Sequence, residues 1–427
     1  MKLLFIDQHF GGTKTGGAYK SNFAIINKLM DDPFFQIRVL ARETKTFFTK
    51  NLRVKKIKPH LTLPKEGLNT LIKFLRVNQY FSIFPILLEI KRYKPDVILV
   101  QRDMTFSAII AGFLTKTPVI NVIRDIYGFC PKYINVKNFK ECCERILERK
   151  ECWRCIDRWK KLRVHLLDKP RGFEHSLLAE LYSLFYKFRY FLIKFYTFFM
   201  KYTYLNIIAS PMMQKIIEPK AKTNRFLVSN ITPIQPDDTN EIKKIPQKIL
   251  NKIDDFKHTL LFVIPRNEGG SKGYPFVKEL IEKLPGSFLF VIVGTIIDEL
   301  KQYNNVINLD KVPSQILSAY YKMADITLVP SLGTEAFGRV ILESLFNLTP
   351  AIISPQCGAK YLFTDKNYVK ILELNLSLWV EGIKDFIQNP AKINEKEIKK
   401  LKNQFSPSNT TDKLIKIMRF ISKNEKY

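Results

Sequence analysis

The chain lacks the long apolar runs that form membrane-spanning helices. No uninterrupted apolar stretch reaches the roughly 20 residues that such a helix needs. The opening MKLLFIDQHF is a short strand pattern followed by a polar loop, which is too brief for the core of a secretory signal peptide. The sequence therefore predicts a cytoplasmic protein, and attachment to the inner face of the membrane would be peripheral.

Acidic residues are scarce relative to basic ones. The chain has 40 Asp and Glu against 69 Lys and Arg, which gives a net charge of +29. This excess favours anionic partners, namely phosphorylated ligands, anionic lipid surfaces or nucleic acid. Nucleic acid is the least favoured of the three, because the basic residues are spread along the chain and no nucleic-acid-binding motif occurs.

Histidine is also sparse, and several sequence patterns of catalytic sites are absent. The five histidines show no metal-ligand spacing, no Ser-His-Asp arrangement is suggested, and no Asp-x-Asp motif occurs. Hydrolysis through an activated nucleophile therefore has little support.

The residues that are present suit a globular protein of two domains. A length of 427 residues allows two sizeable cores, and an apolar content of 46% is that of a globular chain. Strand and helix patterns alternate over residues 1–232 and again over 257–405. Residues 233–256 are rich in Pro, Asp and Lys and are expected to be a linker, and 406–427 form a basic helix. This alternation predicts an α/β fold with two doubly wound parallel sheets.

The most informative segment is 330–358, PSLGTEAFGRVILESLFNLTPAIISPQCG. Glu335 follows the loop after a buried strand, and Glu343 lies eight positions later in an apolar helical pattern. The strand–loop–helix order points the free N–H groups of the helix N-terminus at the region above the strand end. Both carboxylates can therefore face one ligand. The alternative is an ordinary amphipathic helix with two solvated glutamates.

This segment resembles the glutamate-x7-glutamate motif of family four retaining glycosyltransferases of the group-1 type. The likeness extends to EAFGRVILE and to the following TPAIISPQCGA. It implies two Rossmann-like domains facing across a cleft (the GT-B fold), with an acceptor domain over 1–232 and a nucleotide-sugar domain over 257–405. It also implies that the helix over 406–427 crosses back to the first domain.

The resemblance implies a role for each residue of the motif. Glu335 would contact the transferred sugar and stabilise positive charge at its reacting carbon, and Glu343 would bind the ribose hydroxyls of the nucleotide. Backbone amides around Phe337 and Gly338 would meet sugar or phosphate oxygens, and Arg339 belongs to the same donor-binding set.

A second motif, VIPRNEGGSKGYPFVKELIEKL, carries two cations around a Gly-rich loop. Arg266 and Lys272 follow a strand, and Gly273 opens the next helix. Two cations beside a helix N-terminus suit a diphosphate, whose charge must be neutralised as its bond to the sugar breaks. The motif resembles the family's arginine–lysine pair, so both are predicted to be catalytic together with Glu335, and no catalytic metal is expected. The alternative is two solvated loop cations.

The first domain offers weaker signals. Gly16 and Gly17 precede its first helix in a loop that resembles the family's GGA pattern and lets backbone approach a phosphate, although a plain turn is the alternative. Family relatives often carry His-Asp after a later strand, whereas this chain has Arg124 before Asp125. Arg124 would either recognise a carboxylate on the donor or fill the cleft, which leaves the donor sugar open.

Five of the six cysteines cluster in an insert over residues 130–155: Cys130, Cys142, Cys143, Cys152 and Cys155. The Cys-x-x-Cys spacing at 152–155 is that of metal ligands, and Cys130 with one of the 142–143 pair could complete a tetrahedral thiolate site. The sequence predicts a structural zinc in a reducing compartment, with unligated thiols as the alternative. Cys357 stands apart and is expected to pack.

The helix predicted over 180–204 is unusually aromatic. Four polar residues recur every seven positions and form one narrow stripe: Glu180, Lys187, Lys194 and Lys201. Two interpretations remain open. The helix lies on an anionic membrane interface, or it is buried in the first domain while its lysines extend to solvent.

Taken together, the motifs favour a retaining glycosyltransferase that uses a nucleotide diphosphate sugar. Its acceptor would be a glycan or a lipid-linked molecule, in the synthesis of a surface polysaccharide. The alternatives are a non-enzymatic nucleic-acid-binding protein with a zinc module, and a phosphorylase or epimerase on the same fold. Phosphorylases of this architecture bind pyridoxal phosphate through a lysine, and no clear site for that cofactor is visible.

Overall fold

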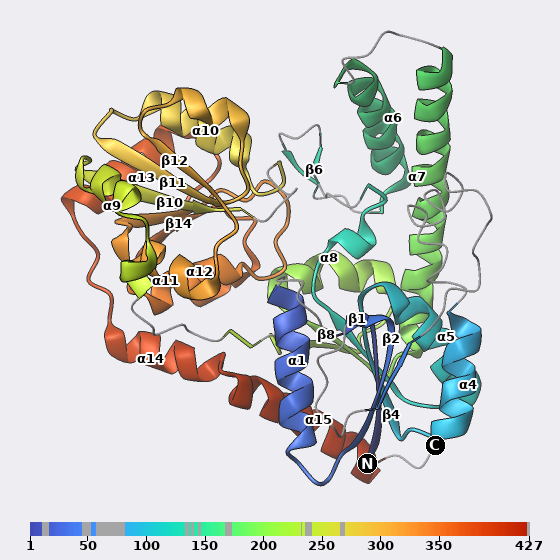
Figure 1. The fold of residues 1–427 in the computed structure, drawn as a ribbon. Helices are drawn as coiled ribbons and strands as arrows, with labels where there is room; N and C mark the ends of the chain where they lie inside the picture. Colours follow the sequence, from blue (N-terminus) through green and yellow to red (C-terminus); the bar gives the residue numbers. More distant parts are fainter. Residues whose placement is uncertain are drawn as a thin grey trace. The chain divides into compact units, whose positions relative to one another are not determined.

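The computed structural model describes residues 1–10, 17–44, 53–56, 82–132, 136–137, 141–143, 147–166, 173–231, 233–234, 241–264 and 270–424. The chain divides into two compact units, each of which is α/β (Figure 1). The first comprises Met1–Tyr133, Glu144–Pro233 and Phe405–Tyr427, and the second comprises Ile134–Cys143 and Ile234–Gln404.

The first unit is built on a parallel sheet of seven strands in the order β3-β2-β1-β4-β5-β8-β9. The strands are β1 (Lys2–Phe10), β2 (Gln36–Thr44), β3 (Arg53–Lys56), β4 (Val97–Gln101), β5 (Val119–Ile123), β8 (Leu205–Ile208) and β9 (Phe226–Val228). Every residue of β4 and β5 is buried, as expected for strands covered on both faces. The strand order reverses between β1 and β4, and ligands of such sheets bind outside the carboxyl ends at this point.

The helices of the first unit are α1 (Gly17–Met30), α4 (Ile83–Tyr93), α5 (Thr105–Thr115), α6 (Arg149–Leu166), α7 (Phe173–Phe199), α8 (Pro211–Ala221) and α15 (Pro407–Asn424). Helix α15 packs against α1, where Leu414 and Met418 join a buried cluster with Ile25 and Ile26. Arg419 Nη2 also lies 2.7 Å from Asp32 Oδ2. The terminal helix therefore returns to the first unit, as the sequence predicted.

Two segments of the first unit differ from the sequence prediction. The aromatic helix begins at Phe173, seven positions before Glu180, and after Phe199 it continues as a short 3-10 turn, η3 (Met200–Tyr202). The cysteine insert is more ordered than a loop, because Cys152 and Cys155 lie on α6, whose sequence is rich in Arg, Lys and Leu, which favour helix. The part of the insert that belongs to the second unit contains a small antiparallel pair of strands, β6 (Val136–Lys137) and β7 (Glu141–Cys142).

The second unit has a parallel sheet of six strands in the order β12-β11-β10-β13-β14-β15. They are β10 (His258–Val263), β11 (Phe288–Gly294), β12 (Val306–Asp310), β13 (Ile326–Val329), β14 (Ala351–Ile353) and β15 (Val369–Ile371). The helices are α9 (Gln247–Asp254), α10 (Tyr274–Lys283), α11 (Ser314–Met323), α12 (Arg339–Phe346), α13 (Leu376–Gln388) and α14 (Glu395–Gln404). The strand order reverses between β10 and β13.

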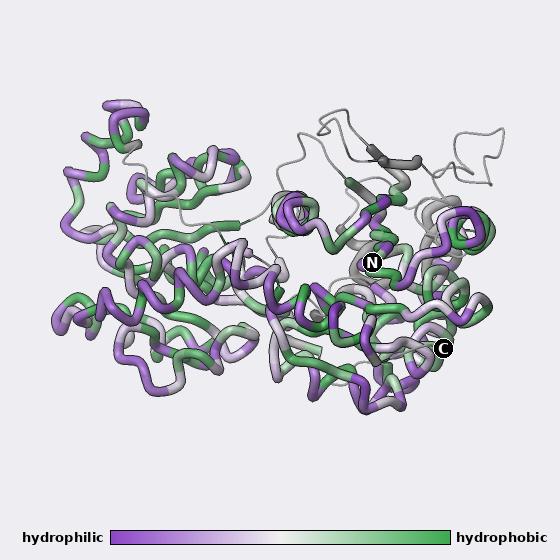
Figure 2. The backbone as a smooth tube through the Cα atoms, turned by 90° about the horizontal axis from the view of Figure 1, so that it is seen from below, coloured by the Kyte–Doolittle hydropathy of each residue, from purple (hydrophilic) through white to green (hydrophobic). Residues whose placement is uncertain are grey.

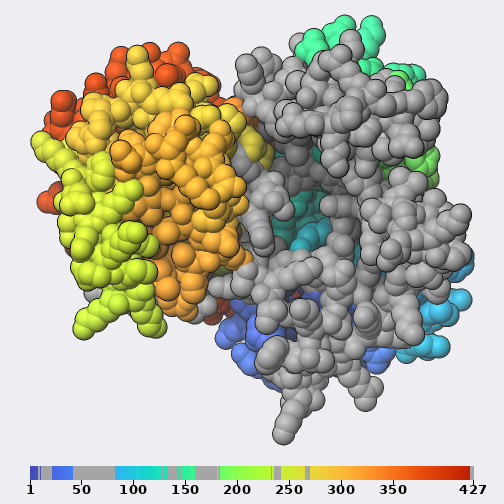
Figure 3. All heavy atoms as spheres, turned by 45° about the horizontal axis from the view of Figure 1, so that its top comes forward, coloured from blue at the N-terminus to red at the C-terminus, as the bar shows by residue number. Residues whose placement is uncertain are grey.

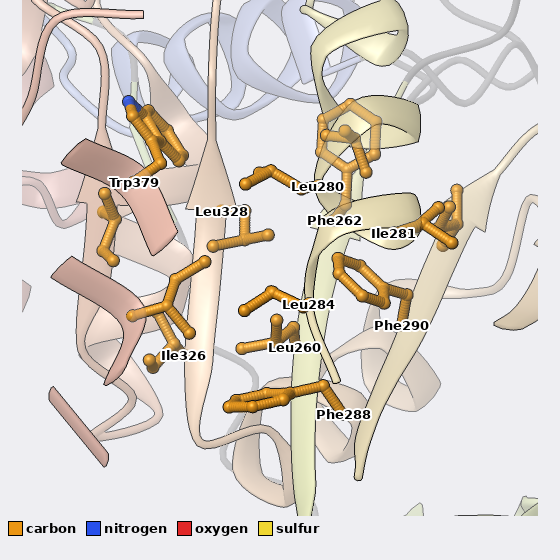
Figure 4. Packing of buried hydrophobic residues seen from close by; sticks show 14 of the residues in the cluster. Leu260, Phe262, Leu280, Ile281, Leu284, Phe288, Phe290, Ile326, Leu328 and Trp379 are labelled. Atoms are coloured by element: carbon orange, nitrogen blue, oxygen red, sulfur yellow. The ribbon is translucent and has the colours of Figure 1, made fainter. Parts of the chain in front are cut away.

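Strand alternation gives the second unit a core on each face of its sheet. Leu260 and Phe262 of β10 point to one face, where they meet α10 and Trp379 of α13 (Figure 4). Leu261, between them in sequence, points to the other face and joins a cluster with α11. Figure 2 shows the same pattern in colour, with apolar strands and with helices that alternate between apolar and polar residues.

The segment expected to be a linker contributes to this second core. Residues 241–254 contain η4 (Glu241–Lys244) and α9, and Ile242, Ile245 and Ile249 pack into the α11 cluster. Helix α9 lies at the surface of the second unit, in yellow-green in Figure 3. Among the described residues, no helix combines the length and the apolar character needed to cross a bilayer.

Candidate functional site

The predicted motifs of the second unit meet where its strand order reverses. The segment between β10 and α10 and the segment between β13 and α12 both leave the carboxyl ends of neighbouring strands. Residues 270–273 of the first segment and the whole of the second are described. Arg266 lies outside the described residues, so its assignment stays a prediction.

The two segments are held together by their backbones. The amides of Leu332 and Gly333 donate to the carbonyl of Ser271 over 2.9 and 3.0 Å. Gly273 adopts φ +86°, and a Cβ at this position would lie 1.8 Å from the carbonyl oxygen of Pro330. Only glycine permits both the backbone conformation and the close approach. The neighbouring Lys272 is therefore fixed beside the segment that carries Glu335.

Lys272 and Glu335 form an ion pair that is mostly buried. Lys272 Nζ donates to Glu335 Oε1 over 2.7 Å, and the two side chains are 18% and 15% exposed. Ser331 Oγ donates to the other carboxylate oxygen over 2.8 Å. Burial by itself would raise the pKa of Glu335, but the charge and hydrogen bond of Lys272 and the hydroxyl of Ser331 bring this pKa below its ordinary value. Glu335 is thus ionised at neutral pH.

The thiol of Cys357 also contacts the carboxylate of Glu335. The backbone around Glu335 pairs with the segment before η6 (Gly358–Leu362), since Glu335 N donates to Gln356 O over 2.8 Å and Gly358 N donates to Glu335 O over 2.9 Å. This pairing brings Cys357 Sγ to 3.8 Å from Glu335 Oε2. Burial and the nearby carboxylate raise the pKa of the thiol, which stays protonated and can donate. Cys357 is buried, as expected, but it also contacts the site.

Helix α12 begins four residues after Glu335. Gly338 caps it with φ +97°, and the buried Phe337 precedes the cap. An α-helix leaves its first N–H groups without partners in the helix, and these groups attract anions. The N-terminus of α12, at Arg339, therefore lies two residues after Phe337 and four after Glu335 along the chain.

Glu343 lies on the second turn of α12 and contacts two side chains. Arg339 Nη2 is 3.6 Å from its Oε1, one helical turn earlier, and Tyr321 Oη donates to its Oε2 over 3.3 Å. Tyr321 is buried, and burial together with the charge of Glu343 raises the pKa of its hydroxyl far above the usual range. Tyr321 is hence a permanent donor, and it leaves the partly exposed Glu343 as an acceptor for ligand hydroxyls.

The structure thus places six predicted residues on adjoining segments of one unit: Lys272, Glu335, Phe337, Gly338, Arg339 and Glu343. The sequence missed Ser331, Tyr321 and the contact of Cys357. The motif PSLGTE offers Ser331 four positions before Glu335 as a signal, whereas nothing local to Tyr321 or Cys357 indicates what they touch.

Three more residues that the sequence predicted to bind the donor belong to the first unit. Gly17 is the first residue of α1, and Arg124 follows the carboxyl end of β5. Gly16 lies outside the described residues.

The first unit also contains a buried polar cluster that the sequence did not predict. Asp7 of β1 is fully buried and accepts hydrogen bonds from Asn22 of α1, from Gln101 Nε2 at 3.2 Å and from Arg102 Nη2 at 2.9 Å. Arg102 adopts φ +63° directly after β4. The cluster adjoins the reversal point between β1 and β4. An aspartate inside the apolar run KLLFID was the available signal.

No disulfide joins Cys130, Cys143, Cys152 or Cys155. Cys130, Cys143 and Cys152 are buried and Cys155 is partly exposed. Burial, and then the neighbouring Cys130 and Cys155, raise the pKa of Cys152 to about 11. Within the described part of the chain no group of three or more His, Cys, Asp or Glu is placed to hold a metal, and the side chain of Cys142 is not described. The zinc site stays a prediction.

A family model described as glycosyl transferases group 1 matches residues 251–404. This segment is a group 1 glycosyltransferase domain. It covers most of the second unit, including every site segment described above. The match confirms the family resemblance and the expectation of a transferase, and the non-enzymatic alternative loses its support. A sequence comparison with curated proteins finds no match.

Solved structures with the same fold are similar to this chain over almost its whole length. Sucrose-phosphate synthase from Thermosynechococcus elongatus is 14% identical, with a TM-score of 0.62, and the match covers 99% of this chain and 100% of that one. A glycosyltransferase from Rickettsia africae is 16% identical, with a TM-score of 0.62 and 99% of both chains covered. HepE from Anabaena, solved with UDP-glucose, is 15% identical, with a TM-score of 0.61 and 98% and 99% covered. These likenesses confirm the GT-B fold.

Proposed function

We propose that the chain is a retaining glycosyltransferase that moves a sugar from a uridine diphosphate sugar to a glycan or lipid-linked acceptor. The observation that carries the proposal is the ion pair of Lys272 and Glu335 at the strand-order reversal of a group 1 domain. The choice of uridine rests on HepE, a structural neighbour solved with UDP-glucose. Surface polysaccharide synthesis is the proposed role.

Lys272 is assigned to the leaving diphosphate. Its ammonium is held at the mouth of α10 by Gly273 and is directed toward Glu335. A diphosphate beside it would gain a cation, the free N–H groups of two helix N-termini and, by the sequence prediction, Arg266. Fixed donors of this kind act where negative charge develops, and the loss of one typically lowers kcat about 100-fold to 1,000-fold.

Glu335 is assigned to the sugar. Its carboxylate is ionised and is held on both oxygens, so it presents a fixed negative charge. Such a charge stabilises the positive charge that grows on the anomeric carbon as the bond to phosphate lengthens. Glu343, backed by Tyr321, accepts hydrogen bonds from the ribose hydroxyls.

Retention follows if the acceptor attacks the face that the diphosphate leaves. The bond between the anomeric carbon and the phosphate oxygen breaks, and a bond from the acceptor oxygen to that carbon forms. The acceptor proton passes to the departing phosphate oxygen, so no protein nucleophile is needed. The acceptor is assigned to the first unit, where the Asp7–Arg102 cluster adjoins the reversal of strand order between β1 and β4.

A structural zinc is proposed for the cysteine insert. Burial and the neighbouring Cys130 and Cys155 raise the pKa of Cys152, and a bound cation would offset this by stabilising the thiolates. The remaining ligand is expected from the 142–143 pair on sequence grounds alone. Metal analysis of the purified protein should find one zinc per chain, lost in Cys152→Ser/Cys155→Ser and kept in Cys357→Ser. A wild-type protein purified without zinc, and folded without it, would remove this proposal.

The function is tested with a panel of nucleotide diphosphates and their sugars. Calorimetry should show binding of UDP, and the best UDP-sugar should be turned over with its anomeric configuration kept, as read by NMR of the product. Glu335→Gln should still bind UDP but lose about 100-fold or more in kcat. Glu381→Gln, at an exposed position on α13, is the matched control and should behave as wild type. Full turnover by Glu335→Gln, or an inverted product, would contradict the proposal.

A further inference from the structure

One side of α7 carries a continuous row of exposed apolar residues. The row consists of six side chains that are 36–66% exposed. They follow one another along the sequence at alternating intervals of four and three positions: Leu184, Phe188, Phe191, Phe195, Phe198 and Tyr202 of η3. Such spacing keeps a row on one side of a helix. Globular surfaces rarely expose contiguous apolar patches of this kind unless something binds there.

The opposite side of α7 is packed against the first unit. Tyr186, Tyr190 and Ile193 are buried, and the buried Arg189 donates through Nη1 to the carbonyl of Pro131 over 2.7 Å. The helix is therefore held firmly by one side, and the exposed row is a fixed feature of the surface. The buried side agrees with the interpretation that the helix packs in the first domain, and the membrane interpretation stays a prediction.

The exposed row continues onto the neighbouring helices. The rings of Phe113 on α5 and Tyr202 are 4.4 Å apart between centroids. Helix α5 packs between α7 and α4, on one side of the sheet (Figure 1). Four more large apolar residues of these helices are exposed: Phe84 and Leu88 on α4, and Phe113 and Leu114 on α5. We call the exposed residues of α4, α5, α7 and η3 the aromatic face.

The charges around the aromatic face are mostly positive. Lysines flank the row at 187, 194 and 201; Lys187 pairs with Asp157 of α6 over 2.8 Å, and Lys201 Nζ lies 3.9 Å from the ring centroid of Phe198. Two more cations, Lys91 and Arg92, end α4. Neither α5 nor the part of α7 after Glu180 contains an acidic residue. An anionic partner would therefore meet a mostly positive surface there.

The same spacing disfavours a second copy of the chain as the partner. In an antiparallel helix pair, the lysine row of one copy would face the lysine row of the other. In a parallel pair, the lysines would face the row of Phe185, Leu192 and Phe199, which offers no counter-charge. Flanking positions normally supply opposite charges to such seams.

We propose that the aromatic face binds an anionic lipid surface, with α7 lying in the plane of the interface. Aromatic and apolar side chains enter the boundary between head groups and acyl chains, and the flanking lysines contact the negative head groups. The surface-bound enzyme would meet lipid-linked acceptors there. This last point rests on the proposed function, whereas lipid binding itself does not.

Flotation of the full chain with vesicles tests the proposal. The protein should float with phosphatidylcholine vesicles that contain phosphatidylglycerol, float much less with phosphatidylcholine alone, and dissociate as salt is raised. Phe188→Ser/Phe195→Ser should lower the bound fraction about tenfold, because it removes apolar insertion. Lys194→Glu/Lys201→Glu should lower it about as much.

Matched changes on the second unit provide the controls. Ile296→Ser/Leu378→Ser removes two equally exposed apolar side chains, and Lys384→Glu/Lys399→Glu reverses two exposed lysines. Both should float as wild type does. UDP calorimetry on every variant checks folding and tests the donor site separately. Equal flotation of all variants, or no binding to anionic vesicles, would overturn the proposal. A dimer in light scattering that Phe188→Ser/Phe195→Ser dissolves would also overturn it, in favour of self-association.

Discussion

At the scale of single residues, the site depends on how Glu335 is kept ionised inside the protein. A mostly buried carboxylate is stable in its charged form only if its oxygens have partners. Here an ammonium, a hydroxyl and a thiol supply them, each from a different segment. Removal of each partner should therefore have a distinct effect.

The substitution Lys272→Met should reverse the pH dependence that Glu335 contributes to the stability of the folded protein. In wild type the pKa of Glu335 is lowered, so its stabilising effect is present above the unfolded value near 4.5 and is lost as pH falls below it. Without the lysine, burial raises this pKa, and stability is lost as pH rises through the new value. Urea unfolding at pH 7 should show a loss of about 2 kcal/mol, which shrinks toward pH 4.

A double variant provides the control for this prediction. Lys272→Met/Glu335→Gln leaves no charge to bury and should recover most of the lost stability at pH 7. A single Lys272→Met protein with wild-type stability at both pH values would mean that water, rather than the lysine, stabilises the carboxylate.

Cys357→Ala should shift the acid limb of the activity profile. The thiol helps to lower the pKa of Glu335, so its removal should raise that pKa and move the acid limb of kcat/KM to higher pH. Cys357→Ser keeps a donor and should leave the limb in place. An unshifted limb in Cys357→Ala would show that the thiol only fills space.

At the scale of elements, two glycines set the geometry of the helix mouths. Gly273 lets the loop before α10 touch Pro330, and Gly338 starts α12 in a left-handed conformation. The sequence predicted the position of Gly273 because it precedes an apolar helical pattern, and Gly338 was indicated by the family resemblance. The sequence also predicted the alternation of strands and helices in both units.

Gly273→Ala should damage both stability and donor binding. A left-handed backbone costs a residue with a side chain about 1–2 kcal/mol, and the clash with the Pro330 carbonyl adds to this. Lys272 must then move, so UDP affinity should also fall. Gly286→Ala is the control, because a Cβ there meets nothing within 4 Å. Thermal unfolding and calorimetry measure the two effects, and equal behaviour of the two variants would contradict the argument.

The sequence did not reveal the contacts between side chains on different elements. Tyr321, which donates to Glu343, and the partners of Asp7 come from other elements, and pattern within one element carries no information about them. The sequence predicts a linker around α9 because its Pro and Lys conceal a row of isoleucines at helical spacing. The residue types of the site were predictable, whereas the neighbours that tune them were not.

At the scale of the whole molecule, the two units have separate cores. Met418 on α15 belongs to the core of the first unit, and Trp379 on α13 belongs to that of the second. Met418→Ala should lower the stability of the first unit by about 2–5 kcal/mol, through lost burial and the cavity left behind. UDP should stabilise only the transition of the second unit in scanning calorimetry. One common shift of both transitions in Met418→Ala would show that the units unfold together.

The return of α15 also has a consequence for the order in which the protein matures. Translation delivers the whole second unit before the last helix of the first has left the ribosome. Until then Ile25, Ile26 and their neighbours lack the covering that Leu414 and Met418 provide. Until residues 407–424 follow, a newborn chain thus has a complete second unit and a first unit whose core is still open to water.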